Sequence, residues 1–590
     1  MLAIRNRIGH ILLALALALT AFAPVSNIAQ AQSTTSLSWT TGVKSDIPTI
    51  DPALVSDTTS NQVASETNAT LVRPNEEDLA KIDPDEAVDL PKTSSDGLTL
   101  TFSLRKDVFW VQWDVASKSV VEFKDASGNP VPVTAKDFEY GIKRTLDPRT
   151  ASTYAYVFNS LIVGANDFNS YKPPAPAGGT PDPAATPDAA ALQKLSDAVG
   201  VKAIDDYTLE IKLTQPYAFT LGILGLPNAA AQPKVAIDKY GDKWTEPGNA
   251  LSYGPYVVSE WKHDSSLTMT KNPFWPGTVN SPKASVDTIV LPFLESTPSF
   301  NNYQQGKLDV IQNAVPIDQL DRIRANATLG KELKILPNYC TYYYGFNTTK
   351  APFDDARVRR AFSYAIDRES LVKNVTKGGE EPAFWMGHPG LAAGPTLENS
   401  PELGIKYDAA QAKKELQSYL DEKKITVDKL PSISLLLNNT EAHVKIATAI
   451  QQMWQKTLGV KVQVSAQEWK VFLNTLSNDP PQVFRSGWCK DYADENNFTR
   501  DIFNSASGQN NEKYTSKDFD KLTDDAAVLA DPAKRLTLYQ QAEELLVKTD
   551  AAIAPIYWYT SVALTKPYIK RTYSLGQGDD RFEKWSVSSH

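Results

Sequence analysis

Apolar residues recur along this chain with two different periods, and both periods occur from one end to the other. Residues 98–104 and 207–213 alternate between apolar and polar side chains, which is typical of half-buried strands. Residues 460–464 alternate in the same way directly after Gly459. Because strand and helix patterns are mixed over the whole length, we expect an α/β fold.

Helical periodicity is clearest in three places. Residues 440–458 and residues 355–374 each place their apolar side chains on one face, and a third helix is predicted to begin with Asp531 as N-cap and Pro532 at its first position. We interpret these apolar faces as core. Residues 171–191 are instead rich in Pro, Ala, Gly and Thr, which indicates a flexible surface insertion.

The N-terminus has the features of an export signal. Arg5 and Arg7 precede an apolar run at 11–19, and the small-x-small triplet 29–31 follows. This pattern predicts a signal peptide over residues 1–31. The alternative is a membrane anchor, but the apolar run is too short to span a bilayer. Because no cysteine lies near the cleavage site, we expect a soluble periplasmic protein rather than a lipoprotein.

Size and charge narrow the class of protein. The chain has 590 residues, too many for one hydrophobic core, so two or more lobes are expected. Residues 1–31 hold two basic and no acidic residues, so their removal moves the formal net charge from -9 to -11. This negative charge argues against nucleic acid or an anionic membrane surface as the main partner.

The two cysteines of the chain are far apart, and aromatic residues surround both. Cys340 lies in residues 339–344 (YCTYYY) and Cys489 in residues 487–492 (GWCKDY). In an oxidising compartment we expect them to form a disulfide, with two separate buried thiols as the alternative. Asp491 follows the second cysteine closely. An acid among aromatic rings suits a ligand that has an amine at one end and a variable body.

Catalytic motifs are not evident. The sequence has no Gly-x-Ser-x-Gly elbow, phosphate loop, His-Glu-x-x-His motif or dinucleotide fingerprint. After removal of the signal peptide four histidines remain, none of them paired at metal spacing: His263, His388, His443 and His590. We therefore expect no catalytic residue, metal or cofactor. An exported hydrolase that uses two carboxylates stays open as an alternative.

Several motifs together resemble one family. These motifs follow one another over the mature chain: residues 133–138 (VTAKDF), 254–256 (GPY), 340–344 (CTYYY), 351–359 (APFDDARVR), 365–368 (AIDR), 487–492 (GWCKDY), 514–522 and 555–559 (PIYWY). In this order they resemble the motifs of the periplasmic oligopeptide-binding proteins of ABC importers, in the peptide, nickel and dipeptide group of solute-binding proteins (family 5).

The resemblance implies an α/β clamp of two lobes, like a type II periplasmic binding protein, with an extra subdomain inserted in the first lobe. The chain is then expected to cross between the lobes near residues 338–345 and 555–559. The implied division is a signal peptide at 1–31, lobe I at 32–70, 235–339 and 557–590, the inserted subdomain at 71–234, and lobe II at 340–556.

The same resemblance implies the roles of individual residues. Asp491 matches the carboxylate that pairs with a peptide's α-ammonium, although a structural salt bridge is the alternative. The other implied ligand-binding residues are Trp488 and Trp469 in side-chain pockets (or plain core), Arg485 and His443 near the peptide's carboxylate (or, for His443, plain surface), one of Tyr154 and Tyr156, and Cys489.

The chain also departs from the family's pattern. Gly345 stands where the family has a glutamate that faces a side-chain pocket, and Leu476 stands where an arginine can occur. A lysine used for the shortest peptides falls opposite Thr376, with Lys377 one place away. The amine end of the site is therefore expected to be retained, and the other end to be altered.

The implied function is capture of oligopeptides in a closing interlobe cleft and delivery to an inner-membrane ABC permease. Backbone hydrogen bonds would supply affinity independent of peptide sequence, and hydrated pockets would tolerate many side chains. A monomer without a nucleic-acid partner is expected. Alternatives are another amine-bearing or non-peptide solute, such as a dipeptide, a nickel chelate or a sugar, and the exported hydrolase.

Overall fold

The computed structural model describes residues 35–42, 44–172 and 188–589. The predicted signal peptide and most of the segment 171–191 lie outside these residues. The described residues belong to one compact unit. Among them, no helix combines the length and the apolar character needed to cross a bilayer.

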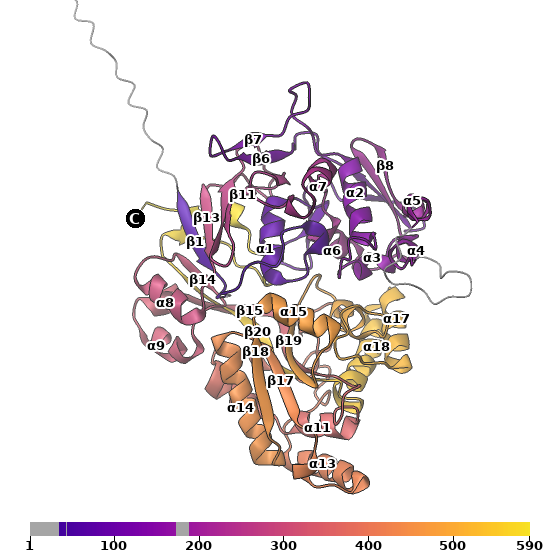
Figure 1. Ribbon diagram of the computed structural model, residues 1–590, viewed down its shortest axis with the longest axis vertical. Coiled ribbons are helices and arrows are strands. Elements are labelled where there is room, and N and C mark those ends of the chain that lie inside the picture. Colours follow the sequence, from indigo (N-terminus) through magenta and orange to yellow (C-terminus); the bar gives the residue numbers. More distant parts are fainter. Residues whose placement is uncertain (1–34, 43, 173–187, 590) are drawn as a thin grey trace, which may run out of the picture. The chain divides into compact units, whose positions relative to one another are not determined.

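A mixed sheet of eleven strands runs through the described part of the chain (Figure 1). Parallel pairs such as β17 and β18 occur beside antiparallel ones such as β15 and β19, so the predicted α/β character is confirmed. The strands in spatial order are β11 (Tyr256–Lys262), β12 (Ser266–Lys271), β13 (Thr288–Pro292), β1 (Ser36–Thr40), β14 (Val310–Gln312), β20 (Ile553–Thr565), β15 (Leu333–Phe346), β19 (Val483–Cys489), β17 (Ile433–Asn438) and β18 (Val462–Gln467), with the short β16 (Glu381–Pro382) beside β20.

Two long antiparallel strands, β15 and β20, join the two halves of this sheet. Residues 333–337 of β15 pair with residues 560–564 of β20, close to β14. Residues 341–345 pair with residues 553–558, and there β19 lies on the other side of β15. The register shifts between these two stretches. Each strand therefore belongs to both halves of the sheet.

A region between β1 and β11 has smaller sheets and its own core. A four-stranded sheet there runs β4 (Lys92–Thr93), β5 (Thr99–Ser103), β9 (Thr208–Lys212) and β8 (Val201–Asp205). A three-stranded sheet runs β10 (Leu251–Ser252), β6 (Val111–Asp114) and β7 (Ser119–Glu122), and β2 (Val72–Pro74) pairs with β3 (Ile82–Pro84). Helices α1 (Thr58–Thr67) and α2 (Ala135–Leu146) contribute to this region.

Helices pack against the other half of the main sheet. α14 (Glu441–Leu458) lies along β17 and β18 (Figure 1). Its buried Ile446, Ile450 and Trp454 share a core with Val358 and Phe362. The neighbouring helices are α11 (Ala356–Tyr364), α13 (Ala409–Lys423), α15 (Trp469–Asn478), α17 (Lys517–Val528) and α18 (Pro532–Glu544).

Most of the elements expected from periodicity are confirmed. The strands expected at 98–104 and 207–213 are β5 and β9, and they pair with each other. The helix expected at 440–458 is α14, with Thr440 as N-cap and Gly459 in the left-handed region that ends it. The helix expected from Asp531 is α18, whose first amides donate to the Asp531 carboxylate.

Two expectations about secondary structure are wrong. Residues 355–374 do not form one helix, because α11 ends at Tyr364 and a new helix, α12 (Arg368–Leu371), begins with Asp367 as its N-cap. The buried Arg368 guanidinium donates to the carbonyls of Ser363 and Ile366, which satisfies the freed end of α11. Residues 189–191, predicted as flexible surface, are the first turn of α5 (Ala189–Ala198).

Candidate ligand-binding site

A cavity of about 840 Å³ is lined by both halves of the main sheet. Its walls come from β19 and β20, the N-terminal ends of α1, α14 and α15, and the chain around Tyr154. Sites for small ligands typically measure roughly 300–1,000 Å³. The cavity is therefore large enough for an organic ligand about as large as a short peptide.

One edge of β19 opens into this cavity. β17 pairs with β19 only at Val483 and Phe484. The rest of the strand, residues 485–489, lines the cavity and has no neighbouring strand on that side among the described residues. An exposed strand edge offers unpaired backbone groups, so an extended ligand can add to it as a further strand.

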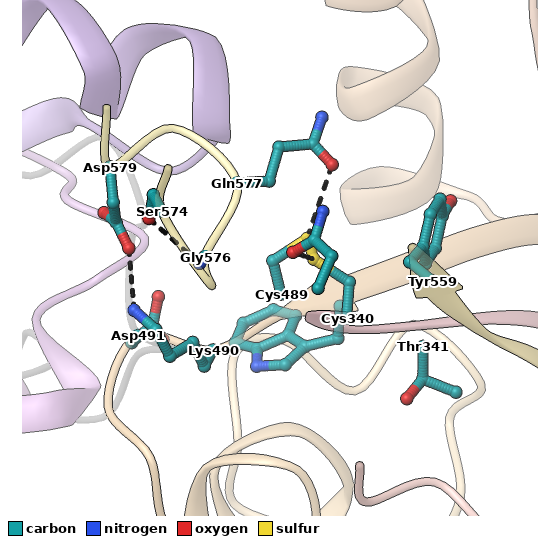
Figure 2. The surroundings of a disulfide bond; sticks show 12 residues. Cys340, Thr341, Cys489, Lys490, Asp491, Tyr559, Ser574, Gly576, Gln577 and Asp579 are labelled. Carbon is teal, nitrogen blue, oxygen red and sulfur yellow. Dashed lines mark hydrogen bonds and ion pairs between the residues drawn. A yellow bond between two sulfur atoms is a disulfide. The ribbon is translucent and has the colours of Figure 1, made fainter. Parts of the chain in front are cut away.

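The predicted disulfide between Cys340 and Cys489 is confirmed. The two cysteines lie directly opposite each other in the β15–β19 ladder (Figure 2). Cys489 lines the cavity, whereas Cys340 is fully buried behind it. The bond fixes the end of β19 to β15, immediately before the turn that carries Asp491.

Asp491 is held in the cavity wall by neutral groups. Asn497 accepts a hydrogen bond from the Asp491 backbone N–H at 2.8 Å and donates its side-chain amide to Oδ2 at 2.9 Å. The Tyr154 hydroxyl donates to the other carboxylate oxygen, Oδ1, at 3.2 Å. The carboxylate is thus oriented by two side-chain donors, neither of which carries a positive charge, and Asn497 also holds the Asp491 backbone.

Asp491 forms no ion pair with any described Lys, Arg or His. The expected alternative, a structural salt bridge at this residue, is therefore not observed. Burial raises the pKa of Asp491 to about 7, against the lowering effect of Asn497, and the nearby Asp501 raises it further. A partly buried carboxylate without a cation is a site prepared for a cationic ligand group.

The structure distinguishes the two candidate tyrosines. Tyr154 lines the cavity and contacts Asp491. Tyr156 packs against Tyr154 with ring centroids 5.6 Å apart, but it does not line the cavity, and its buried hydroxyl has no hydrogen-bond partner among the described residues. Tyr154 is therefore the one of the two that lies in the cavity wall beside Asp491, and Tyr156 packs against it.

Both tryptophans of interest line the cavity. The Trp488 indole donates to Asn497 at 3.2 Å, so it belongs to the same network as Asp491. Trp469 begins α15 and stacks on Phe472 with ring centroids 5.9 Å apart. Its buried indole N–H faces the Asp57 carboxylate, whose pKa is raised by burial and lowered in part by this donor.

Arg485 is a buried cation in the same cavity. Its guanidinium donates to the Tyr559 hydroxyl at 2.5 Å and to Asn438 at 3.3 Å, and it lies 4.7 Å from the ring centre of Tyr342. Its Nε has no hydrogen-bond partner, and no described carboxylate forms an ion pair with it. Aromatic rings stabilise the charge partly, and a buried guanidinium of this kind can accept an anionic group as a further partner.

His443 lies close to Arg485 at the start of α14. It is half-buried rather than on the open surface, and its ring centre lies 5.5 Å from that of Tyr342. Burial, and then the Arg485 guanidinium, lower the pKa of His443 well below its ordinary value. The imidazole is therefore neutral and can donate one hydrogen bond to an anion bound at Arg485.

Of the positions that depart from the family's pattern, Leu476 and Thr376 line the cavity, whereas Gly345 does not. A Cβ on Gly345 would lie 2.4 Å from both Glu512 Oε1 and the Phe484 ring, so these side chains occupy the space of a residue there. Leu476 is buried and lines the cavity. Thr376 also lines it and donates to Glu380, whereas Lys377 forms an ion pair with Asp321 and does not line it.

Sequence reasoning missed several residues of the site. Asn497 orients Asp491, and Tyr559 and Asn438 hold Arg485. Asp57 lines the cavity as the N-cap of α1, and its Oδ1 accepts from the backbone N–H groups of Thr59 and Ser60. In the sequence, Asp57 stands directly before the helix that begins at Thr58. This position indicates an N-cap, and no signal in the sequence indicates that Asp57 lines a cavity. Within the described residues, no group of acidic, His and Cys side chains is arranged to hold a metal ion.

Comparison with known proteins gives a consistent result. Residues 81–510 match the family model described as "Bacterial extracellular solute-binding proteins, family 5 Middle". The chain is 33% identical over 479 residues to the periplasmic oligopeptide-binding protein OppA of Escherichia coli, covering 81% of this chain and 79% of that one. It is 31% identical over 553 residues to the oligopeptide-binding protein OppA of Bacillus subtilis, covering 92% and 91%.

The fold of this chain is also similar to that of a solved oligopeptide-binding protein. Haemophilus influenzae OppA in complex with the peptide RPPGFSPFR superposes with a TM-score of 0.78 at 25% identity, covering 94% of this chain and 99% of that one. A two-lobed α/β fold with one large cavity defines the class of extracytoplasmic solute-binding proteins. Within that class, the chain belongs to family 5 of the bacterial extracellular solute-binding proteins.

Proposed function

We propose that this protein captures oligopeptides with a free amino terminus and presents them to an ABC permease. In this role Asp491 binds the α-ammonium group, Arg485 and His443 bind the carboxylate, and Trp488 and Trp469 line side-chain pockets beside Cys489 and Tyr154. The names of the relatives, which are oligopeptide-binding proteins, support the same ligand class.

The observation that carries the proposal is a pair of unmatched opposite charges in one cavity. Asp491 has no cation and Arg485 has no anion among the described residues, although both line the same space. Removing a charge from water is costly unless a partner compensates for it. A zwitterionic ligand supplies both partners at once, which a sugar or a neutral solute does not.

The strand edge between these charges suits a peptide in particular. Arg485 and Asp491 are six positions apart, at most roughly 20 Å of extended chain. An antiparallel peptide of roughly three to five residues would fill this span, pairing its backbone with residues 485–489. Its side chains would point alternately toward the cavity walls, where Trp469 and Trp488 lie.

We also propose that the ligand is enclosed by hinge motion of two lobes. The long strands β15 and β20, which belong to both halves of the sheet, are the connections about which the lobes would turn. The lobes proposed are residues 32–70, 235–339 and 557–590 with the insertion 71–234, and residues 340–556. The closed form would be the one that the permease recognises.

The proposal includes the cellular location of the protein and the fate of its ligand. The periplasm is proposed, with residues 1–31 as a cleaved signal peptide and no lipid anchor, because relatives of this chain are periplasmic by name. We expect a monomer that releases its ligand unchanged, since the relatives are binding proteins rather than enzymes. A hydrolase would instead convert added peptides into shorter products.

Native mass spectrometry of protein isolated from cells, before and after denaturing release of bound material, tests the function. We expect additional masses that correspond to peptides of roughly three to five residues, and their return when the stripped protein meets a peptide mixture. Protein that is empty in both states would contradict the ligand class. Shortened peptides would indicate hydrolysis instead.

Tyr154→Phe is expected to weaken peptide binding about tenfold, because it removes the hydroxyl that orients the Asp491 carboxylate. Tyr156→Phe is the matched control. Its hydroxyl bonds to no described residue, so affinity should stay within about twofold of the original. Calorimetric titration of both variants measures the difference. Equal losses of affinity in the two variants would show that the Tyr154 hydroxyl has no specific role in peptide binding.

Peptide affinity is expected to decrease as the pH falls below about 7. The pKa of Asp491 in the ligand-free protein is raised to about 7 by burial, so acidification protonates the carboxylate that must receive the ammonium. The groups that face it are Tyr154, Asn497, Asp501 and Lys490. Below that pKa the affinity should fall about tenfold per pH unit.

Titrations between about pH 5 and pH 8 check this prediction. An N-acetylated peptide is the control, because it carries no ammonium group and its weak binding should not follow the ionisation of Asp491. A free-amine peptide with constant affinity across this range would show that Asp491 does not bind the amine.

A further inference from the structure

Lys490 is a buried cation beside the proposed amine site. It lies between the disulfide and Asp491, and its side chain is only 3% exposed. Its Nζ forms an ion pair with Asp579 Oδ2 at 2.7 Å (Figure 2). Asp579 belongs to the C-terminal loop, defined here as residues 574–580, and also lines the cavity.

The C-terminal loop holds Asp579 in place without a ligand. Asn61 on α1 donates to the Gly578 carbonyl at 2.8 Å and to Asp579 Oδ1 at 3.1 Å. The Leu575 carbonyl accepts from the backbone N–H of Tyr339 on β15 at 2.9 Å. Besides Lys490, the Asp579 carboxylate therefore has one side-chain donor, Asn61, and its loop is bonded to α1 and β15.

The C-terminal loop leaves room for the ammonium group of Lys490. A Cβ on Gly576 would lie 2.7 Å from Lys490 Nζ, so a larger residue there would displace the cation. Gln577 approaches from the same loop, with Oε1 3.8 Å from Cys489 Sγ (Figure 2). The loop therefore contacts the Lys490 ammonium through Asp579 and has no space for a larger residue at Gly576.

Lys490 is a potential competitor for the ligand's amine. It is the neighbour of Asp491 in sequence, and its charge already lowers the pKa of that carboxyl. Asp491 has no cation of its own among the described residues. Opposite charges in a poorly solvated site attract strongly, so an unrestrained lysine would move to this carboxylate and occupy the position of the ligand's ammonium.

We propose that Asp579 is a positioning residue for ligand binding: it holds the Lys490 ammonium at the C-terminal loop and thereby keeps the Asp491 carboxylate free for the ligand's amine. This proposal rests on the proposed function, since it assumes an amine-bearing ligand. It assigns to a buried ion pair a role in selectivity for that amine rather than in stability alone.

A double-mutant cycle with Asp579→Asn, Lys490→Met and their combination tests the proposal. With a free-amine tetrapeptide, Asp579→Asn should lose about tenfold or more in affinity, because the freed lysine competes. Lys490→Met and the double variant should both stay within about twofold of the unsubstituted protein. The loss in Asp579→Asn should vanish with an N-acetylated tetrapeptide.

Other patterns would overturn the proposal. Unchanged affinity in Asp579→Asn would do so, as would equal losses in all three variants, which would make the pair purely structural. A crystal structure of ligand-free Asp579→Asn gives an independent answer. The proposal requires Lys490 Nζ within about 4 Å of the Asp491 carboxylate, and a lysine still at the C-terminal loop would contradict it.

The ligand-free structure also separates this inference from the proposed function. If the unsubstituted protein binds no peptide, the proposed function is wrong, yet the position of Lys490 in Asp579→Asn still decides whether Asp579 restrains it. If the unsubstituted protein binds peptide and the lysine does not move, only the role of Asp579 is wrong.

Discussion

Asp491→Asn is expected to weaken the binding of a free-amine tetrapeptide about a hundredfold or more at about pH 8. The substitution keeps the shape of the side chain but removes its charge, and an amide NH2 replaces one of the two oxygens that accept from Asn497 and Tyr154. The ligand's ammonium would then be buried without an anion. Leaving one member of a desolvated charge pair unmatched costs about 2–5 kcal/mol.

Two controls separate this effect from a general loss of negative charge. Glu380→Gln removes an acid from the same cavity, but Glu380 is held by Thr376 and the Gly378 amide, away from the Asp491 network. It should change the affinity by no more than about threefold. An N-acetylated tetrapeptide should bind Asp491→Asn and the unsubstituted protein equally. A similar loss in both acid variants would argue against a specific amine site.

The variant that replaces both Cys340 and Cys489 with alanine is expected to lose about 5 kcal/mol of unfolding free energy. The disulfide closes a loop with a sequence separation of 149 residues, and a longer closed loop restricts the unfolded chain more. Because the bond also fixes the end of β19 beside Asp491, peptide affinity should fall as well.

Urea unfolding with and without a reductant measures the contribution of the disulfide. The unsubstituted protein in reductant should approach the stability of the alanine variant, and the variant itself should not respond to reductant. A variant with the stability of the unsubstituted protein would show that the β15–β19 ladder, rather than the bond, restrains this segment.

The sequence predicts the regular parts of the fold well, because burial imposes periodicity. β5, β9, α14 and α18 occur where alternation, a helical stripe or a cap indicates them. The break after α11 could not be predicted in this way. It depends on the buried Arg368, whose guanidinium satisfies carbonyls of its own segment and of Pro555, far away in sequence.

The candidate site was likewise predicted only in part from the sequence. The disulfide followed from two cysteines in a chain predicted to be exported, and the motifs of the family indicated Asp491 and Arg485. The contacts that orient these charges come from other elements. Tyr154 reaches Asp491 across 337 positions, and Asp579 reaches Lys490 across 89. Since no periodicity or spacing encodes such contacts, only the folded chain shows them.

The altered end of the site also needed the structure. Gly345 could be read as the loss of an acid, but the buried Glu512 lies against that position from another segment. Burial raises the pKa of Glu512 to about 8, so this carboxyl is mainly neutral at pH 7. Glu512 therefore fills the space beside Gly345 as a mainly neutral group, and neither residue lines the cavity.

The central claim is that two unmatched charges in one cavity bind the two ends of a peptide. Calorimetric titration of the ligand-free protein with a tetrapeptide, its N-acetyl derivative and its C-terminal amide tests this claim most directly. We predict that the free peptide binds tightly. Its N-acetyl derivative, which has no ammonium group for Asp491, should bind about a hundredfold more weakly, and its C-terminal amide, which has no carboxylate for Arg485, should also lose substantial affinity. Equal affinities for the three peptides would contradict the account.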